Sequence, residues 1–474
     1  MNFEEYRGFD ATGLAGLVAR GEVTPRELFE RAEARARELA ETLNAVSVWD
    51  LDHAEAALEA GPPAGPFTGV PFLLKDLYAF LRGTRLTNGS RLTRDVTADF
   101  DTTFVARVRA AGLVVFGKTT TPEFGLNVVT EPVLHGPCRN PWNTAFSPGG
   151  SSGGAAAAVA AGVVPMAHAT DGGGSTRIPA SHCGLVGLKP SRARIPMGPL
   201  VAEAWSGLVT GLVVSRSLRD TARFLDAVHG PENGDFYTCP PPSAPFVESL
   251  ERPPGRLRVA LVRQAPLAIP LAPEVETALG DAARLLEEMG HGIEEASIPI
   301  DGERMAAAFL DVVSANCAND LEAWGKRLGR RLDRHHLERC TLALVERGRE
   351  VSAVTYLRSL QTVQQAARAF GEMFRRFDLV LSPVCAAPPP RIGEIDQNDL
   401  LPVRFLERNR PYVCFTSLYN ASGCPAISLP LHVTAEGLPV GVMLGAPFGG
   451  EERLLSVAAE IERARPWFGR LPPV

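Results

Sequence analysis

Lysine is scarce in this chain, although basic residues are not. Of the 48 lysine and arginine residues, the only lysines are Lys75, Lys118, Lys189 and Lys326. Arginine is effectively never deprotonated, whereas a lysine that loses its hydration can become a neutral base near neutral pH. Each of the few lysines is therefore a candidate for a chemical role that arginine cannot fill.

An excess of positive charge is also missing. The formal net charge is -6 and the pI is about 5.9, which gives no basic field for nucleic acid. The arginine-rich stretch 326–350 is the one candidate for such a patch, but its interleaved acids favour a solvated helical face above an apolar one. We therefore expect a small-molecule partner and no nucleic acid.

Paired cysteines and long hydrophobic runs are missing as well. The longest apolar stretch, 153–169, consists of small residues and contains Pro165, which predicts a core helix running into a strand and no membrane span. The N-terminal MNFEEYRGFD has acids where a secretory signal has positive charge. No C-x-x-C pair occurs, so we expect reduced, mostly buried thiols and a cytoplasmic protein without a membrane partner. The cysteines are Cys138, Cys183, Cys239, Cys317, Cys340, Cys385, Cys414 and Cys424.

What the chain does contain is the pattern of a globular α/β protein. Its 474 residues, 45% of them hydrophobic, can bury a large core, and length alone would predict about three domains. T-P-R-E at 24–27 is a capping box with proline at the first helical position. Apolar runs at 70–74 and 113–116 alternate with helical stretches. Further strands are expected at 163–169, 257–262, 379–384, 426–431 and 439–444, a helix at 273–290 and a long connection at 230–256.

Two glycine-rich loops carry candidate nucleophiles. Ser175 lies in T-D-G-G-G-S-T-R at 170–177, where the N–H groups of three glycines could converge on one oxygen. Ser151 and Ser152 lie in G-G-S-S-G-G at 149–154, at the predicted start of a helix, where N–H groups are free to donate. A serine hydroxyl becomes a nucleophile only when a base takes its proton.

Other motifs share parts of the loop at 149–154. Gly149 and Gly154 have P-loop spacing, but Ala155 and Ala156 stand where lysine and serine or threonine are required. The loop also matches the G-x-S-x-G nucleophile elbow, although no hydrophobic strand precedes it. A plain glycine-rich turn is the third alternative.

Lys75 is the candidate base. It ends the apolar run 70–74, where loss of hydration favours the neutral amine. The structural alternative is a lysine that extends to water or pairs with Asp76. His168 and His182 are near the serines in sequence, but each suits a structural role better than that of a base.

These residues and their order resemble the amidase signature family. The motifs that carry the resemblance are G-V-P-F-L-L-K-D at 69–76, P-G-G-S-S-G-G at 148–154 and D-G-G-G-S-T-R-I-P-A at 171–180. The similarity covers nearly the whole chain and is weakest from about 230 to 400. It also includes segments at 117–123, 139–143, 187–190, 420–426 and 437–441.

The resemblance implies a fold that differs from the expectation based on length. It implies one domain over residues 1–474, in which a mixed, twisted central sheet is sandwiched by helices. The catalytic motifs would lie within 60–200, and a variable region at 230–400 would cover the active site. The resemblance implies no metal and no cofactor, and it leaves a homodimer open.

The resemblance also implies a Ser-cis-Ser-Lys triad that hydrolyses carboxylic amides. Ser175 would attack the carbonyl, while Ser151, on a cis peptide after Gly150, would pass its proton to neutral Lys75. The relay would return a proton to the leaving amine, and water would then hydrolyse the acyl-enzyme. The oxyanion hole would consist of the N–H groups of Gly172, Gly173, Gly174 and Ser175.

By the same resemblance, other residues would support the loops or line the acyl pocket. Ser152 would donate a hydrogen bond that supports the catalytic residues without touching the substrate. Asp171 and Arg177 would support the loop of Ser175. Gly172 departs from the family, because many members carry a larger residue there, so we expect a looser loop or a larger pocket. The candidate pocket residues are Phe124, Asn127, Cys317 and Tyr419, with core packing an equal alternative for Cys317.

The sequence leaves three candidate functions: a stand-alone amide hydrolase, an amidotransferase subunit and a non-catalytic binding protein. Ile178 follows Arg177, where the amidase subunit of a tRNA-dependent amidotransferase usually has glutamine, and this favours a stand-alone hydrolase. The run 174–190 is similar to that of bacterial hydrolases acting on cyclic or linear nylon oligomers. A non-catalytic binding protein is disfavoured because all three triad residues are present. The sequence therefore predicts an amidase for small linear or cyclic amides and does not name the amide.

Overall fold

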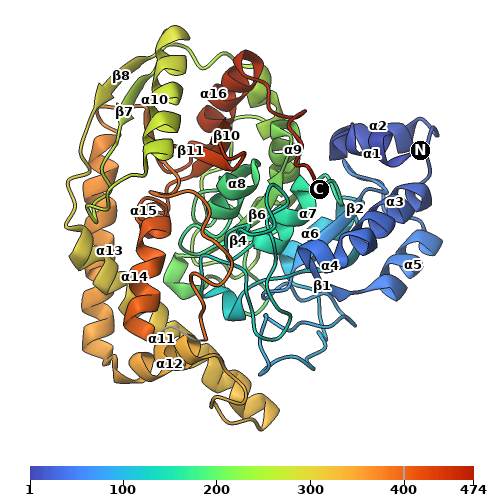
Figure 1. Cartoon of the computed structure of the whole chain (residues 1–474), viewed down its shortest axis with the longest axis horizontal. Coiled ribbons are helices and arrows are strands. Elements are labelled where there is room, and N and C mark those ends of the chain that lie inside the picture. Colours follow the sequence, from blue (N-terminus) through green and yellow to red (C-terminus); the bar gives the residue numbers. More distant parts are fainter. Residues whose placement is uncertain (399–400) are drawn as a thin grey trace.

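A single mixed β-sheet runs through the computed structural model, which describes residues 1–398 and 401–474 (Figure 1). Over these residues the strand order is β1-β3-β2-β4-β6-β5-β10-β11-β9-β7-β8. The strands are β1 Val46–Trp49, β2 Pro71–Lys75, β3 Val114–Thr119, β4 Met166–Asp171, β5 Val186–Lys189, β6 Thr210–Ser215, β7 Arg258–Leu261, β8 Gly292–Glu295, β9 Leu379–Pro383, β10 Ala426–Val433 and β11 Pro439–Gly445. The expected mixed α/β architecture is confirmed.

Helices pack around this sheet, and two groups of them, far apart in the sequence, lie at opposite sides of the molecule (Figure 1). In Figure 1 the N-terminal helices lie beside the β1 end of the sheet, and α11 to α14 lie together at the opposite side. The longer helices are α2 Ala11–Ala19, α3 Pro25–Glu38, α5 Leu51–Ala60, α6 Thr103–Ala110, α7 Gly153–Ala160, α9 Leu218–Val228, α10 Pro273–Glu288, α11 Gly302–Leu328, α12 Arg339–Glu350, α13 Ala353–Met373, α14 Pro402–Val413 and α16 Glu451–Ala464. The shorter ones are α1 Phe3–Arg7, α4 Ala40–Leu43, α8 Arg177–Cys183, α15 Ser417–Ser422, and the 3-10 turns η1 Glu123–Gly125, η2 Trp205–Gly207 and η3 Phe246–Glu251.

Strand direction explains how distant motifs reach one edge of the sheet. β2 pairs with β3 and β4 in parallel, so the carboxyl ends of β2 and β4 lie at the same edge. Lys75 is the last residue of β2, and Asp171 is the last residue of β4. In sheets with parallel strands, ligands bind outside these carboxyl ends. The base and the loop that begins after Asp171 are therefore placed together by topology.

The small-residue helix α7 lies against this part of the sheet. All of its residues are buried, and a side chain on Gly154 would come within 2.5 Å of the Thr120 backbone nitrogen. Alanine and glycine allow this close approach between helix and sheet, which explains the absence of a polar face. The predicted core helix running into a strand is confirmed, although the strand begins at Met166 and not at Val163.

The arginine-rich stretch 326–350 is not a single helix, which corrects the expected continuous face. α11 ends at Leu328, Gly329 follows with a φ of +61°, and α12 begins at Arg339. Arg347 of α12 pairs with Asp311 of α11, so part of the expected solvated face forms an ion pair between the two helices. The capping box at Thr24 is present, and η3 interrupts the predicted long connection.

The structure also tests the predictions about cysteines and membrane-spanning segments. All eight cysteines are buried and free of disulfides, as the sequence predicts. Within residues 1–398 and 401–474, no helix combines the length and the apolar character needed to span a bilayer.

Candidate active site

Lys75 and Ser151 are in direct contact. Lys75 Nζ donates hydrogen bonds to Ser151 Oγ at 2.7 Å and to Thr170 Oγ1 at 2.8 Å. The lysine side chain is fully buried, so it neither extends to water nor forms the alternative pair with Asp76. Asp76 instead accepts from the Thr87 backbone and hydroxyl. Of the four lysines, Lys75, Lys118 and Lys189 are all buried.

Burial controls the protonation of Lys75. Loss of hydration lowers the pKa of its ammonium well below the ordinary value, and the negative charge of Asp171 opposes this only in part. His168 accepts a hydrogen bond from the Lys75 backbone nitrogen at 3.2 Å. Burial, together with Lys75, lowers the pKa of His168 to about 3. His168 is therefore a neutral structural histidine, and the amine is the available base.

The loop of Ser151 is held from several sides. The peptide bond between Gly150 and Ser151 is cis. The Ser151 carbonyl accepts from Thr121 Oγ1 at 3.0 Å. A side chain at Gly150 would lie 2.7 Å from the Asn127 carbonyl oxygen, so only glycine fits there. Ser152 stands at the N-cap position of α7, and its N–H donates to the Ser175 carbonyl at 3.2 Å. The two serine loops are thus bonded to each other.

The loop of Ser175 depends on an unusual backbone conformation. Gly174 has a φ of +137°, and a side chain there would lie 2.5 Å from Thr416 Oγ1. Thr416 Oγ1 donates to the Gly173 carbonyl at 2.6 Å. Glycine is required at 174 for both reasons, and the turn presents the half-buried Ser175 to the adjoining cavity.

Gly174 does not supply a free N–H group, which corrects the predicted oxyanion hole. Its N–H donates to Asp171 Oδ1 at 2.8 Å. In the part of the chain that the structure describes, the N–H groups of Gly172, Gly173 and Ser175 have no protein acceptor. These three residues also line the cavity. The candidate oxyanion donors are therefore narrowed to these three.

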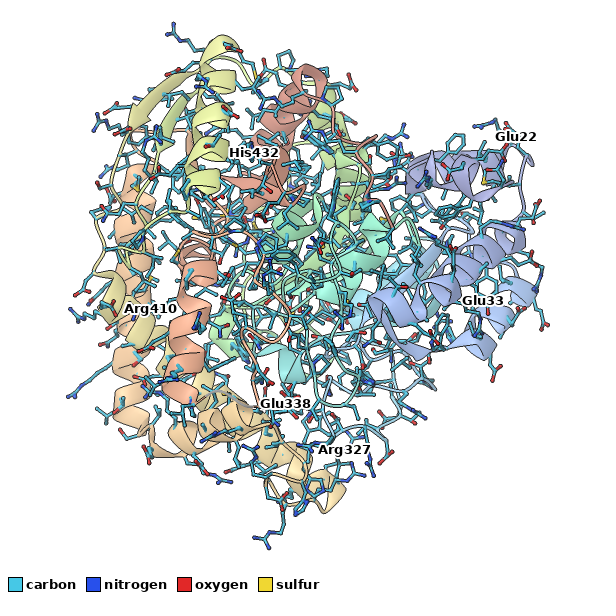
Figure 2. All side chains as sticks on the ribbon, viewed as in Figure 1. Glu22, Glu33, Arg327, Glu338, Arg410 and His432 are labelled. Atoms are coloured by element: carbon cyan, nitrogen blue, oxygen red, sulfur yellow. The ribbon has the colours of Figure 1, made fainter. Side chains whose placement is uncertain are left out.

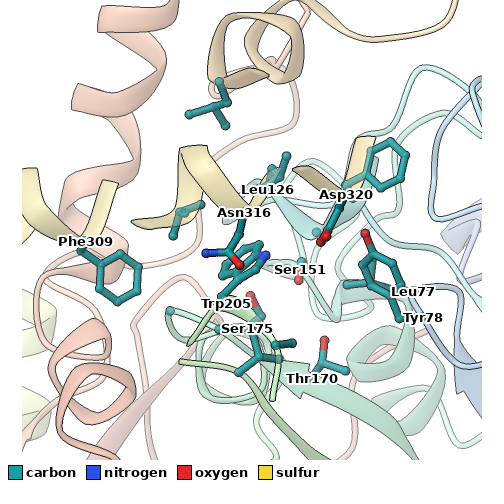
Figure 3. Close-up of a pocket in the computed structure, with 18 of the residues that line it drawn as sticks. Leu77, Tyr78, Leu126, Ser151, Thr170, Ser175, Trp205, Phe309, Asn316 and Asp320 are labelled. Atoms are coloured by element: carbon teal, nitrogen blue, oxygen red, sulfur yellow. The ribbon is translucent and has the colours of Figure 1, made fainter. Parts of the chain in front are cut away.

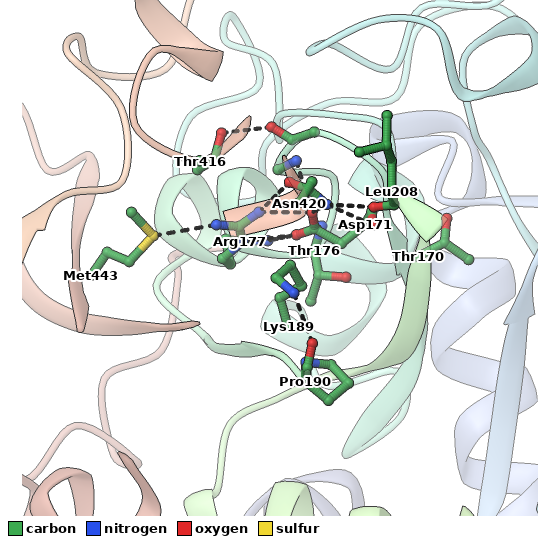
Figure 4. A network of polar contacts seen from close by, with 12 residues as sticks. Thr170, Asp171, Thr176, Arg177, Lys189, Pro190, Leu208, Thr416, Asn420 and Met443 are labelled. Atoms are coloured by element: carbon green, nitrogen blue, oxygen red, sulfur yellow. Dashed lines mark hydrogen bonds and ion pairs between the residues drawn. The ribbon is translucent and has the colours of Figure 1, made fainter. Parts of the chain in front are cut away.

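Asp171 is the centre of a buried polar network (Figure 4). Arg177 donates to it from Nε at 3.0 Å and from Nη2 at 2.8 Å, and Asn420 Nδ2 donates at 2.9 Å. Burial opposes ionisation of Asp171, but Arg177 and Asn420 outweigh it and lower its pKa to about 2. Asp171 and Arg177 therefore fix the nucleophile loop as a buried ion pair, which agrees with the expected support.

A cavity of about 800 Å³ adjoins both serines. Figure 3 shows Ser151, Ser175 and Thr170 on one side of it and Asn316 of α11 on the other. Its walls are largely apolar, with Leu77 and Phe309 among them. Space of this size holds a small molecule.

The four predicted pocket residues divide into two pairs. Phe124 and Asn127 line the cavity, as expected. Cys317 and Tyr419 do not, and these two predictions are wrong. Cys317 is buried in an apolar cluster with Phe124, which fits its alternative core role. Tyr419 is buried beneath Arg177, with the guanidinium carbon 5.6 Å from its ring centroid.

The space beside Gly172 is filled by Trp205 rather than left open. A side chain at Gly172 would lie 2.9 Å from Trp205 Cζ3 and 3.3 Å from Val209 Cγ2. Trp205 lines the cavity from η2. The expected enlargement of the pocket is therefore wrong, because the indole occupies the volume that a larger residue would take.

Sequence inspection missed several residues of this site. Thr170 contacts Lys75, and Tyr78, Asn316 and Asp320 line the cavity. Thr170 could have been found as the residue preceding Asp171 at a strand end. Asn316 and Asp320 could have been found only from the four-residue spacing of polar side chains along a long helix.

Comparison with known proteins gives one consistent group of relatives. The family model described as Amidase matches residues 26–455. A 6-aminohexanoate-cyclic-dimer hydrolase of Paenarthrobacter ureafaciens is 38% identical over 98% of this chain and 96% of that protein. A putative amidase AmiC of Mycobacterium tuberculosis is 37% identical over 97% of this chain and 95% of that protein. A solved structure of 6-aminohexanoate cyclic dimer hydrolase superposes with a TM-score of 0.93 at 37% identity, covering 98% of both chains.

Proposed function

We propose that this chain, which belongs to the amidase signature family, hydrolyses a carboxylic amide through an acyl-enzyme on Ser175. The relatives in this family are amide hydrolases. The observation that carries this proposal is the 2.7 Å hydrogen bond between Lys75 and Ser151, beside the loop of Ser175. Burial favours the neutral amine of Lys75. A buried neutral amine supplies the base that a serine nucleophile needs.

The acylation step follows from this arrangement. Ser175 Oγ attacks the amide carbon while its proton passes to Ser151 Oγ, and the proton of Ser151 passes to Lys75 Nζ. The carbonyl oxygen becomes an oxyanion, which the free N–H groups of Gly172, Gly173 and Ser175 stabilise. The relay then returns a proton to the amide nitrogen, the C–N bond breaks and the amine leaves.

Deacylation uses the same groups in the same order. Water attacks the acyl carbon and gives its proton to the relay, and the relay returns a proton to Ser175 Oγ as the ester bond breaks. The carboxylic acid is then released. Each group acts once as base and once as acid in each half-reaction, so no other proton source is required.

The substrate in this proposal is a small linear or cyclic amide. The largely apolar cavity of about 800 Å³ accommodates such molecules, and the relatives of similar sequence include hydrolases named for a cyclic dimer. Ile178 after Arg177 favours a stand-alone hydrolase over an amidotransferase subunit. Eight buried, unpaired cysteines are typical of a reducing compartment, which supports the cytoplasm as the site of action.

Replacement of Ser175 by alanine tests the proposal directly. On a panel of aliphatic and aromatic amides, the wild-type protein should turn over at least one amide, and Ser175→Ala should lose that activity by a factor of about 10³ or more. Ser422→Ala, outside the cavity, serves as the control. Equal turnover by wild type and Ser175→Ala would remove Ser175 from the mechanism. Mass spectrometry should also detect an acyl adduct on Ser175 in the wild type alone.

A further inference from the structure

Helix α11 lies along the cavity and contributes a regular stripe of side chains to it. The stripe repeats every three or four residues, as expected for one face of a helix. It consists of Glu303, Ala306, Ala307, Phe309, Leu310, Val313, Asn316, Asn319, Asp320, Ala323, Trp324 and Arg327. Most of these side chains are apolar, so a charged member of the stripe requires an explanation.

Asp320 is such a member, and its charge is not neutralised by the protein. In residues 1–398 and 401–474 it has no ion-pair partner, and its one hydrogen bond comes from Asn319 Nδ2 at 3.2 Å. Burial raises the pKa of the Asp320 carboxyl, because its environment is poor in water and in positive charge. A carboxylate in such a place is costly unless something pairs with it.

The other charged residues around the cavity already have partners. Glu303 of α11 pairs with Arg410 of α14, and Arg327 pairs with Asp99 at 3.6 Å. Figure 2 places Arg410 and Arg327 at well-separated parts of the molecular surface. Asp320 and Glu203 are the charged residues of the cavity wall without an ion-pair partner among the described residues, and Glu203 accepts a hydrogen bond from the Tyr237 hydroxyl instead.

The position of Asp320 sets its distance from the reacting serines. Figure 3 shows Asn316 projecting from α11 toward the side of the cavity that holds Ser175 and Ser151, with Asp320 farther along on the side of Tyr78. Four residues of helix advance about 6 Å along the axis. The wall between them is apolar, with Leu77 and Leu126 lining it. This geometry suits a hydrocarbon chain that ends in a positive charge.

We propose that Asp320 binds a primary ammonium group carried by the amide substrate at the end of a short methylene chain. This inference rests on the proposed function, since it places the scissile carbonyl at Ser175. The substrate class is therefore an ω-aminoalkyl amide, recognised by charge at one end and by apolar contact along the chain.

A matched pair of chromogenic amides tests this subsite. 6-Aminohexanoyl-p-nitroanilide carries the ammonium, and hexanoyl-p-nitroanilide has the same chain without it. The wild type should hydrolyse the first with a kcat/KM at least about 10-fold higher, the size of effect expected for one partly buried charge pair. Asp320→Asn should reduce this ratio to near one by raising KM for the charged substrate alone.

Two further variants separate recognition from general effects. Glu322→Gln removes an exposed negative charge from the same helix, where Glu322 pairs with Arg349, and should keep the preference. Asp320→Lys should invert it, so that the mono-p-nitroanilide of adipic acid, with a terminal carboxylate, becomes the better substrate. Inversion is a gain that an unfolded or misfolded protein cannot produce.

The outcomes that would overturn the proposal are specific. They are an unchanged ratio in Asp320→Asn, no preference in the wild type, or an equal loss on both substrates, which would indicate a structural role. Calorimetric binding of 6-aminohexanamide and hexanamide to Ser175→Ala provides a readout without catalysis. If neither anilide is hydrolysed, the proposed function fails, yet a preference for 6-aminohexanamide that Asp320→Asn abolishes would still support the subsite.

Discussion

The Nζ atom of Lys75 lies 2.7 Å from the Oγ atom of Ser151, and the lysine side chain has no exposure to solvent. The two residues come from β2 and from the loop before α7, and they meet because β2 ends at the edge of the sheet where that loop passes. The contact has chemical meaning only if the amine is neutral during part of the cycle. Burial provides that condition by lowering the lysine pKa.

Lys75→Arg should be nearly inactive although the positive charge is kept. Arginine stays protonated in proteins and cannot accept the proton of Ser151, so kcat/KM should fall by about 10³ or more. Steady-state kinetics on the best amide, normalised to folded protein by circular dichroism, measures the effect. Lys118→Arg is the matched control, because Lys118 is also buried but donates to Thr84 Oγ1. Substantial activity in Lys75→Arg would refute the neutral-lysine base.

The acid limb of the pH profile should report on Lys75. Protonation of the amine removes the base, so kcat/KM should fall as the pH falls through the pKa of Lys75. Thr170 Oγ1 accepts a hydrogen bond from Lys75 Nζ and so favours the charged form. Thr170→Val should therefore lower that pKa further and move the acid limb to lower pH.

A control for this shift is available in the same region. Thr121→Val removes a hydrogen bond to the Ser151 carbonyl but no contact with Lys75, so it should change kcat without moving the limb. An acid limb that stays in place in Thr170→Val, or that moves equally in both variants, would mean that Lys75 does not set it.

Asp171→Asn should destabilise the protein strongly. It leaves the Arg177 guanidinium buried without its counter-charge, a change that typically costs about 3 to 5 kcal/mol in the free energy of unfolding. Urea denaturation monitored by tryptophan fluorescence measures this loss. Asp311→Asn, which removes a partly exposed partner of Arg347, should cost less than about 1 kcal/mol.

The same carboxylate predicts a direction of pH dependence for stability. The folded-state pKa of Asp171 is about 2, below its ordinary value of 3.8, so the unfolded chain binds its proton more readily. Its contribution, on the order of 2 kcal/mol, is therefore present above about pH 4 and is lost as the pH falls toward 2. In Asp171→Asn this part of the acid dependence should be absent.

Much of this site could be predicted from local motifs. The contacts between segments that are distant in the sequence could not. Ser151 and Ser175 stand in loops whose glycines are required by the local backbone, and Lys75 ends an apolar strand. The error at Gly174 arose because sequence could not show that Asp171 takes its N–H group. Tyr419 and Cys317 were misplaced because only the three-dimensional packing decides which face of a buried side chain meets the cavity. Asp320 was missed for the same reason.

The fold, too, could be predicted where the pattern is local and could not where distant segments meet. Alternating apolar runs predicted the strands near the site, with boundaries shifted by a few residues, because hydrophobic pattern reports burial and not the hydrogen bonds that end a strand. The arginine-rich stretch 326–350 looked continuous because its charge pattern does not reveal the turn at Gly329. That turn folds α12 back on α11, the helix that carries Asn316 and Asp320 to the cavity.

Gly172 and Trp205 should behave as a coupled pair. In Gly172→Ala the new methyl group would lie 2.9 Å from Trp205 Cζ3, closer than side-chain carbons pack, and the rigid indole must move. Such overpacking costs about 1 to 3 kcal/mol. Because the N–H groups beside it are the candidate oxyanion donors, we also expect kcat to fall by about 10-fold. Thermal unfolding and steady-state kinetics measure the two effects.

The coupling can be separated from a general effect on the loop. Gly173→Ala should cost less stability, because no atom lies within 4 Å of the position its methyl group would take. Trp205→Ala should enlarge the cavity and raise KM for small amides, and the double variant with Gly172→Ala should recover stability relative to Gly172→Ala alone. A coupling energy of about 1 kcal/mol or more is expected for such a contact. Strictly additive effects would show that the indole does not limit the space at Gly172, and that the glycine is required there by the backbone alone.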